Sequence, residues 1–141
     1  MTDAKPSAAR AIPAFAIVGA IGFVVDSAVT AGLASAGLSL ALARPPGVIV
    51  ATVLNFFLNR RFTFQATHLP LLPAFLRYVA VTSVGAAINY LTYLAALAAA
   101  AHFGLPATPL TAPIYVAVGV GAAMVVTFNG FRRYAFRDAG K

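Results

Sequence analysis

The sequence predicts an all-α integral membrane protein with four transmembrane helices, arranged as two parallel-repeat helical hairpins with both termini in the cytoplasm. Of its 141 residues, 61% are hydrophobic and only 9% are charged. A soluble domain carries about 25% charged residues, so most of this surface must face lipid. The cations flank long apolar runs, and two of these runs end in the same pattern of aromatic residues around an arginine pair.

Each predicted span is an apolar stretch close to the length of about 20 residues that crosses a bilayer. Charged residues and clusters of proline, glycine and histidine, which are typical of turns, set the boundaries. The predicted spans are 12–36, 46–64, 75–100 and 110–134, and the second is the shortest. This division leaves a cytoplasmic tail over 1–11, a transmembrane domain over 12–137 and a cytoplasmic tail over 138–141.

The distribution of Lys and Arg predicts the orientation. With four spans, the N-terminal tail, the middle connection and the C-terminal end share one side, and of the ten cations only Arg44 lies on the other. Because cytoplasmic loops carry an excess of Lys and Arg, we expect a multi-pass protein of the cytoplasmic (inner) membrane. The first apolar run is longer than the about 7–15 residues of a signal-peptide core, so we expect it to be retained.

The charge balance and the missing residue types exclude several functions. The net charge is +7, and in this setting anionic membrane lipid is the expected partner rather than nucleic acid. There is no cysteine, hence no disulfide and no thiolate metal site. Asp26 is the only acidic residue inside the body, so the paired carboxylates of a glycosidase are missing. We expect no catalysis by this chain, no cofactor and no metal site.

An internal repeat organises the chain. At an offset of 63 residues the first span matches the third, and at an offset of 72 the pair Arg60-Arg61 matches Arg132-Arg133. A pseudo-two-fold axis along the membrane normal would relate two such hairpins. The matched positions of the first and third spans advance by three or four along one helical face: Phe15 with Tyr78, Gly19 with Thr82, Gly22 with Gly85, Asp26 with Asn89, and Thr30 with Tyr93.

Small residues on these faces suit close approach of helix backbones. They are Gly19, Gly22, Gly85 and Ala86, with Gly119, Gly121 and Ala123 in the fourth span. Two interpretations stay open: the face serves helix packing alone, or it also lines a polar path.

Asp26 is the one ionisable group expected deep in the bilayer, where an Asp costs about 2.5–3.5 kcal/mol on insertion scales. Intramembrane carboxyls usually face a bundle interior or a wet cavity, and desolvation favours their neutral form. The structural interpretation is a neutral Asp26 hydrogen-bonded to Asn89, Ser27 or Thr30. The functional interpretation is a contact with a proton or a substrate.

The arginine pairs also have two interpretations. Arginines at a cytoplasmic helix end determine topology, and the flanking aromatics anchor the helix at the interface. Guanidinium groups also match phosphate oxygens in a bidentate manner, so the four arginines could form one phosphate-binding face.

Two motifs resemble the GtrA-like family: the glycine-rich stretch Val18–Phe23 and, more specifically, Asn55–Phe64, which reads Asn-Phe-Phe-Leu-Asn-Arg-Arg-Phe-Thr-Phe. The resemblance covers about residues 12–137. The second hairpin departs from the motif, with Thr127 and Phe131 in place of two asparagines and Asn129 nearby. The resemblance implies a role in cell-surface polysaccharide synthesis, in which members move polyprenyl-phosphate-linked sugars across the cytoplasmic membrane. Similar spans are attached to dolichol-phosphate-mannose-synthase-like glycosyltransferases, where they anchor the enzyme.

The leading hypothesis is therefore a translocator of polyprenyl-phosphate-linked sugar, in which a homodimer would enclose the path. One alternative is a non-catalytic anchor or scaffold for a glycosyltransferase, and another is a small proton-coupled cation exporter, against which the cationic cytoplasmic mouth argues. The candidate phosphate-binding residues are Arg60, Arg61, Arg132, Arg133 and, on the outer side, Arg44. The candidate intramembrane polar path comprises Asp26, Asn89, Thr30, Tyr93, Asn55, Asn59 and Asn129.

Overall fold

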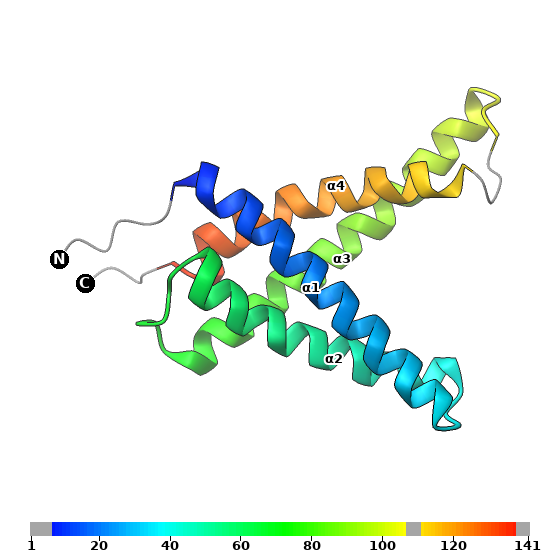
Figure 1. The fold of residues 1–141 in the computed structure, drawn as a ribbon. Helices are drawn as coiled ribbons and strands as arrows, with labels where there is room; N and C mark the ends of the chain where they lie inside the picture. The colour runs from blue at the N-terminus through cyan, green and yellow to red at the C-terminus, as the bar shows by residue number, and fades with distance from the viewer. Residues whose placement is uncertain (1–6, 107–110, 138–141) are drawn as a thin grey trace. The chain divides into compact units, whose positions relative to one another are not determined.

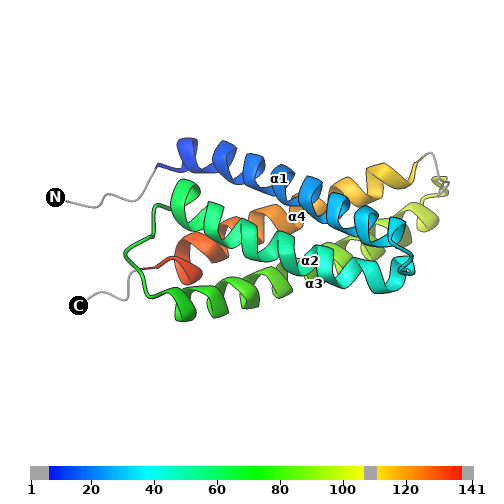
Figure 2. The same cartoon turned by 60° about the horizontal axis from the view of Figure 1, so that its bottom comes forward.

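The computed structural model describes residues 7–106 and 111–137, and this part of the chain contains helices and no strand. The chain divides into two compact units at Leu71, each containing one helical hairpin. Figure 1 shows the helices in chain order, and Figure 2 shows them after a 60° turn. The expected tail over 138–141 and most of the tail over 1–11 lie outside the described residues.

The first hairpin consists of α1 (Ala8–Ser35), α2 (Leu40–Leu58) and a short π-helix, η1 (Asn59–Thr63). The helices α1 and α2 pack side by side, as both views show. At 1.5 Å per residue, the 28 residues of α1 extend for about 42 Å, which exceeds the hydrocarbon thickness of a bilayer.

The second hairpin repeats this order with α3 (Leu71–His102), α4 (Ala112–Gly130) and a second π-helix, η2 (Phe131–Ala135). Both π-helices contain five residues, and each contains an arginine pair. In each, a backbone bond reaches five residues back, from Phe64 N to Asn59 O (2.8 Å) and from Phe136 N to Phe131 O (2.9 Å). Short π segments are rare and are frequent at functional sites.

The two long helices that open the hairpins end in the same way. Gly37 follows α1 with φ +98°, and Gly104 follows α3 with φ +66°, a backbone conformation that side chains disfavour. At each end one amide bonds five residues back, from Leu38 N to Leu33 O (3.1 Å) and from Leu105 N to Ala100 O (2.8 Å). This is the Schellman arrangement, which satisfies the last helical carbonyls and turns the chain back.

Glycines are the points of closest approach inside the first hairpin. Gly22 of α1 is buried against the carboxamide of Asn55 on α2. Gly47 of α2 is buried against α1, where an added Cβ would lie 2.6 Å from Asp26 Oδ1 and 2.9 Å from the Asp26 backbone oxygen. The two helices of the hairpin therefore pack through two symmetric contacts. In each contact, a glycine of one helix lies against a polar side chain of the other helix.

The second hairpin repeats these contacts at the offsets found in the sequence. Gly85 of α3 lies against Thr127 of α4, and Gly119 of α4 lies against Asn89 of α3. The pairs Gly22–Asn55 and Gly47–Asp26 fall on these at offsets of 63 for the first helix of each hairpin and 72 for the second. The internal repeat is thus confirmed at the level of individual helix contacts. The axis that relates the two hairpins stays a prediction.

Three described stretches are long and apolar enough to cross a membrane: Ala9–Ser35, Leu71–His102 and Ile114–Ala135. Their positions correspond to the first, third and fourth predicted spans. The second predicted span corresponds to α2, which has 19 residues and is not one of the three. The protein is therefore all-helical with several candidate spans in its described part, while the count of four and the cytoplasmic termini stay predictions.

Two details of the sequence-based prediction were wrong. First, α2 begins at Leu40 instead of 46, so Pro45 and Pro46 lie inside the helix and do not start it. Intramembrane helices tolerate such prolines because neighbouring groups satisfy the freed backbone carbonyls. Second, Gly19 and Gly121 do not contact the paired helix of their own hairpin, since an added Cβ would meet no described atom within 4 Å at either position.

Candidate functional site

The side chain of Arg60 stabilises the loop that follows η1. Its Nη2 donates hydrogen bonds to the carbonyl oxygens of Thr67 and Leu69, both at 2.6 Å. Bonds from a charged donor are roughly twice as strong as neutral ones. Arg60 is half-buried, and these bonds tie η1 to the chain just before α3. This structural role takes up part of the guanidinium, and phosphate binding by Arg60 stays a prediction.

Arg61 is exposed, and its guanidinium group is available to a ligand. Its guanidinium carbon lies 5.7 Å from the centre of the neighbouring Phe62 ring. It forms no hydrogen bond or ion pair with any residue that the structure describes. The two arginines of η1 thus differ: one is bonded to the protein, and the other presents its donors outward.

In η2, both arginines have guanidinium groups that are available to a ligand. Arg132 is half-buried and Arg133 is exposed, and neither bonds to a described part of the chain. A third arginine approaches from α3: the guanidinium carbon of Arg77 lies 5.7 Å from the centre of the Tyr134 ring. The second hairpin therefore gathers three cations around η2, whereas the position equivalent to Arg77 in the first hairpin is Ala14.

Replacing Arg60 by alanine is expected to lower the free energy of unfolding by about 2 kcal/mol, because two charge-assisted hydrogen bonds are lost at a half-buried site. Arg61→Ala is the matched control and is expected to change it by less than about 0.5 kcal/mol, as for a surface substitution. Denaturant titration in mixed detergent micelles, followed by circular dichroism, measures both. Equal effects of the two substitutions would contradict the stabilising role of Arg60.

The carboxyl of Asp26 faces the α1–α2 contact. Thr30 donates a hydrogen bond from Oγ1 to Asp26 Oδ1 at 3.3 Å, one helical turn away. Both side chains are half-buried and lie against Gly47. The bond to Thr30 is one of those that the structural interpretation expected. A role of Asp26 in a polar path stays a prediction.

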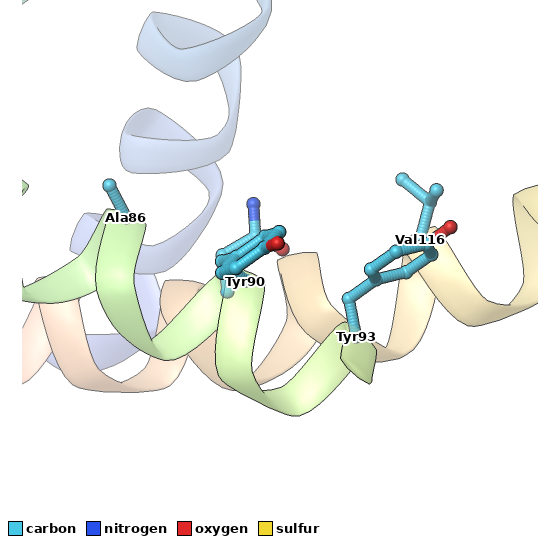
Figure 3. A pocket seen from close by; sticks show the side chains of 5 residues that line it. Ala86, Tyr90, Tyr93 and Val116 are labelled. Atoms are coloured by element: carbon cyan, nitrogen blue, oxygen red, sulfur yellow. The ribbon is translucent and has the colours of Figure 1, made fainter. Parts of the chain in front are cut away.

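Asn89 occupies the equivalent place in the second hairpin, where it lies against Gly119 and borders a pocket of about 270 Å³. The other lining residues that the structure describes are Ala86, Tyr90, Tyr93 and Val116. Figure 3 shows that Ala86, Tyr90 and Tyr93 rise from one side of α3, with Val116 reaching the pocket from α4. Of the predicted polar-path residues, Asn89 and Tyr93 are therefore brought together.

The remaining predicted residues are scattered through the two hairpins. Asn55 packs on Gly22, and its buried Oδ1 has no hydrogen-bond partner among the described residues. Asn59 is buried in η1. Asn129 donates a hydrogen bond from Nδ2 to Val125 O (2.8 Å) in its own helix. Arg44 belongs to α2, but its side chain lies outside the described part of the structure.

A comparison with protein families identifies the chain. The family model named GtrA/DPMS, transmembrane domain, matches residues 14–136, which is nearly the whole sequence. This chain belongs to the GtrA/DPMS transmembrane-domain family. No curated protein matches it. Membership agrees with the resemblance seen in the sequence, and it makes the chain a multi-pass membrane protein associated with polysaccharide or glycolipid synthesis.

Within this GtrA/DPMS domain, two features escaped the sequence analysis. Arg77 was counted only as a topology signal, yet it lies over Tyr134 beside η2. The pocket was also missed, although the spacing of positions 86, 90 and 93 places them on one helical face. A search for polar and aromatic residues at that spacing could have found it.

Proposed function

We propose that this GtrA/DPMS domain moves polyprenyl-phosphate-linked sugars across the cytoplasmic membrane. The observation that carries the proposal is the set of guanidinium groups at the ends of the hairpins. Arg61, Arg132 and Arg133 each sit in a π-helix and bond to nothing in the described residues. A phosphate on a lipid carrier would supply the oxygens that these donors lack.

The sequence of events follows from the expected orientation. The lipid-linked donor is made on the cytoplasmic side, where the positive-inside rule places both arginine pairs. The arginines engage the phosphate, and the sugar then enters the polar region between the helices. The polyprenyl tail stays in lipid throughout. A second copy of the chain could complete the path, since few helices enclose little space.

The test is a flipping assay with purified protein in vesicles that contain a fluorescent polyprenyl-phosphate glucose. An impermeant quencher measures how much lipid crosses the bilayer. We expect Arg132→Gln/Arg133→Gln to slow flipping about a hundredfold or more, because each of the two lost charge-assisted contacts is worth about 1.5–3 kcal/mol. Arg10→Gln/Arg137→Gln removes the same charge elsewhere and is expected to flip at the normal rate.

Two results would contradict the proposal. Wild-type protein that moves no lipid would exclude flipping, and equal rates for the two double variants would exclude the assigned arginines. The variants could also change the orientation of the protein in the bilayer. Because the chain has no cysteine, a single cysteine introduced by Ser7→Cys reports the side of the N-terminus through an impermeant maleimide.

A second candidate is a membrane anchor for a glycosyltransferase. One observation favours it: Asp26 and Asn89, the polar residues at the centre of the predicted path, both lie against glycines of the paired helix. That placement serves helix packing. An anchor would flip no lipid in the same vesicles and would co-purify with the glycosyltransferase, so the two candidates give opposite results.

A further inference from the structure

The pocket of the second hairpin contains neutral polar groups whose hydrogen bonds are unused. Asn89, Tyr90 and Tyr93 border it, and none of the three side chains bonds to a residue that the structure describes. Polar groups inside a membrane are costly unless they are satisfied, and they commonly mark substrate pathways. These groups offer a carboxamide and two phenol hydroxyls, each able to donate and to accept.

The described lining residues carry no formal charge. They include no Lys, Arg, Asp or Glu, so neither a phosphate nor a cation would find an opposite charge among them. Ala86 and Val116 add apolar surface, and two tyrosine rings add flat aromatic faces with negative π-electron density. A sugar ring combines hydroxyl groups with weakly positive C–H faces, and this set of side chains complements both.

The volume of the pocket is suited to a single sugar ring. Pockets for drug-sized ligands start at about 300 Å³, and this one measures about 270 Å³. It is a small site, suited to a monosaccharide rather than to a longer glycan. Tyr90 is 62% exposed and Tyr93 is half-buried, so the pocket can be reached from outside the hairpin.

The first hairpin lacks the equivalent set. At the offset of 63 residues, Tyr90 corresponds to Ser27 and Tyr93 to Thr30, while Asn89 corresponds to Asp26. Thr30 and Asp26 are bonded to each other. The two tyrosines that border this pocket are therefore present in the second hairpin and absent from the equivalent positions of the first.

We infer that the pocket formed by Asn89, Tyr90 and Tyr93 binds the uncharged sugar ring of the lipid-linked substrate at a later step, after its phosphate has left the arginines, because Val116 and Arg132 are about 24 Å apart along one continuous helix. This inference rests on the proposed function for the identity of the lipid. It adds to the proposed function the residues that recognise the sugar, and it assigns them to the second hairpin alone.

The experiment measures binding without transport, in nanodiscs, with two probes: polyprenyl phosphate and polyprenyl-phosphate glucose. Tyr90→Phe/Tyr93→Phe removes only the two hydroxyls and keeps the rings, so folding is little affected. We expect it to weaken binding of the glucosyl lipid about tenfold, as for two lost hydrogen bonds, and to leave binding of the bare phosphate lipid unchanged. Leu91→Ala, equally exposed on the same helix, is the control and should change neither.

The outcomes separate this inference from the proposed function. If the tyrosine variant binds both lipids normally, or weakens both equally, the sugar site is wrong even where flipping is observed. If wild type distinguishes the two lipids through these tyrosines but flips neither, the sugar site holds and the flipping proposal fails. Methyl glucoside forms a third arm: strong competition at millimolar concentration would show that the pocket takes free sugar, which would overturn the assignment to a lipid-linked ring.

Discussion

Gly119→Ala is expected to lower the free energy of unfolding by about 2 kcal/mol, although alanine is the better helix former. An added Cβ would lie 2.6 Å from the backbone oxygen of Asn89 and 3.4 Å from its carbonyl carbon. A flexible side chain could move aside, but the backbone of α3 cannot move without separating the helices. The pocket beside Asn89 should also change shape, so we expect weaker binding of the glucosyl lipid.

Gly121→Ala is the matched control two residues along α4. An added Cβ there would meet no atom within 4 Å, so the substitution should stabilise the helix by up to about 1 kcal/mol. Denaturant titration in mixed micelles, followed by circular dichroism, measures both variants. Opposite signs for the two are the expected result. A Gly119→Ala protein as stable as Gly121→Ala would show that the α3–α4 contact does not depend on this glycine.

Phe131→Ala is expected to cost about 3 kcal/mol, in the range for a buried aromatic side chain. Phe131 is 3% exposed, and its ring stacks on Tyr78 with centroids 4.3 Å apart and an interplanar angle of 12°. It also meets Phe136 edge-on at 6.2 Å. Removing the ring takes away both aromatic contacts and leaves a cavity at the start of η2. Since Arg132 and Arg133 follow directly, we expect flipping to fall as well.

Tyr134→Ala provides the comparison inside η2. Tyr134 is 55% exposed, and its ring forms a cation–π contact with the guanidinium group of Arg77. Exposed contacts of this kind contribute about 0.5–1 kcal/mol, so the loss of stability should be several times smaller. The same micelle titration compares the two variants. Similar losses for both would mean that η2 is not held by the Tyr78–Phe131 stack.

The repeat shows how far the sequence could predict this structure. The offsets of 63 and 72 placed Gly22 with Gly85 and Asp26 with Asn89, and these residues do occupy equivalent helix contacts. This worked because two helices with the same pattern of small and polar residues bury the same face. The helical class and the approximate spans followed from the apolar runs alone.

The failures have physical causes too. Gly47 was missed because the sequence of one helix does not reveal which residue of its neighbour lies opposite, which depends on helix rotation and register. Gly19 and Gly121 look equivalent to the packing glycines by composition, yet both face open space. The second span was predicted to begin at residue 46, directly after the charge of Arg44, while the helix runs from Leu40 to Leu58 and includes Arg44, Pro45 and Pro46.

The sequence by itself determined the membrane class, the two-hairpin repeat and the arginine pairs at the ends of the apolar runs, because hydrophobic length and periodicity are local properties of the chain. Only the tertiary structure decided that Arg60 is bonded to the Thr67 and Leu69 carbonyls while Arg61 is left open. It alone decided that Asn89, Tyr90 and Tyr93 border a common pocket with Val116. Such contacts depend on how two helices rotate against each other and on where a loop carbonyl points, and neither is encoded in the spacing of residues along one segment.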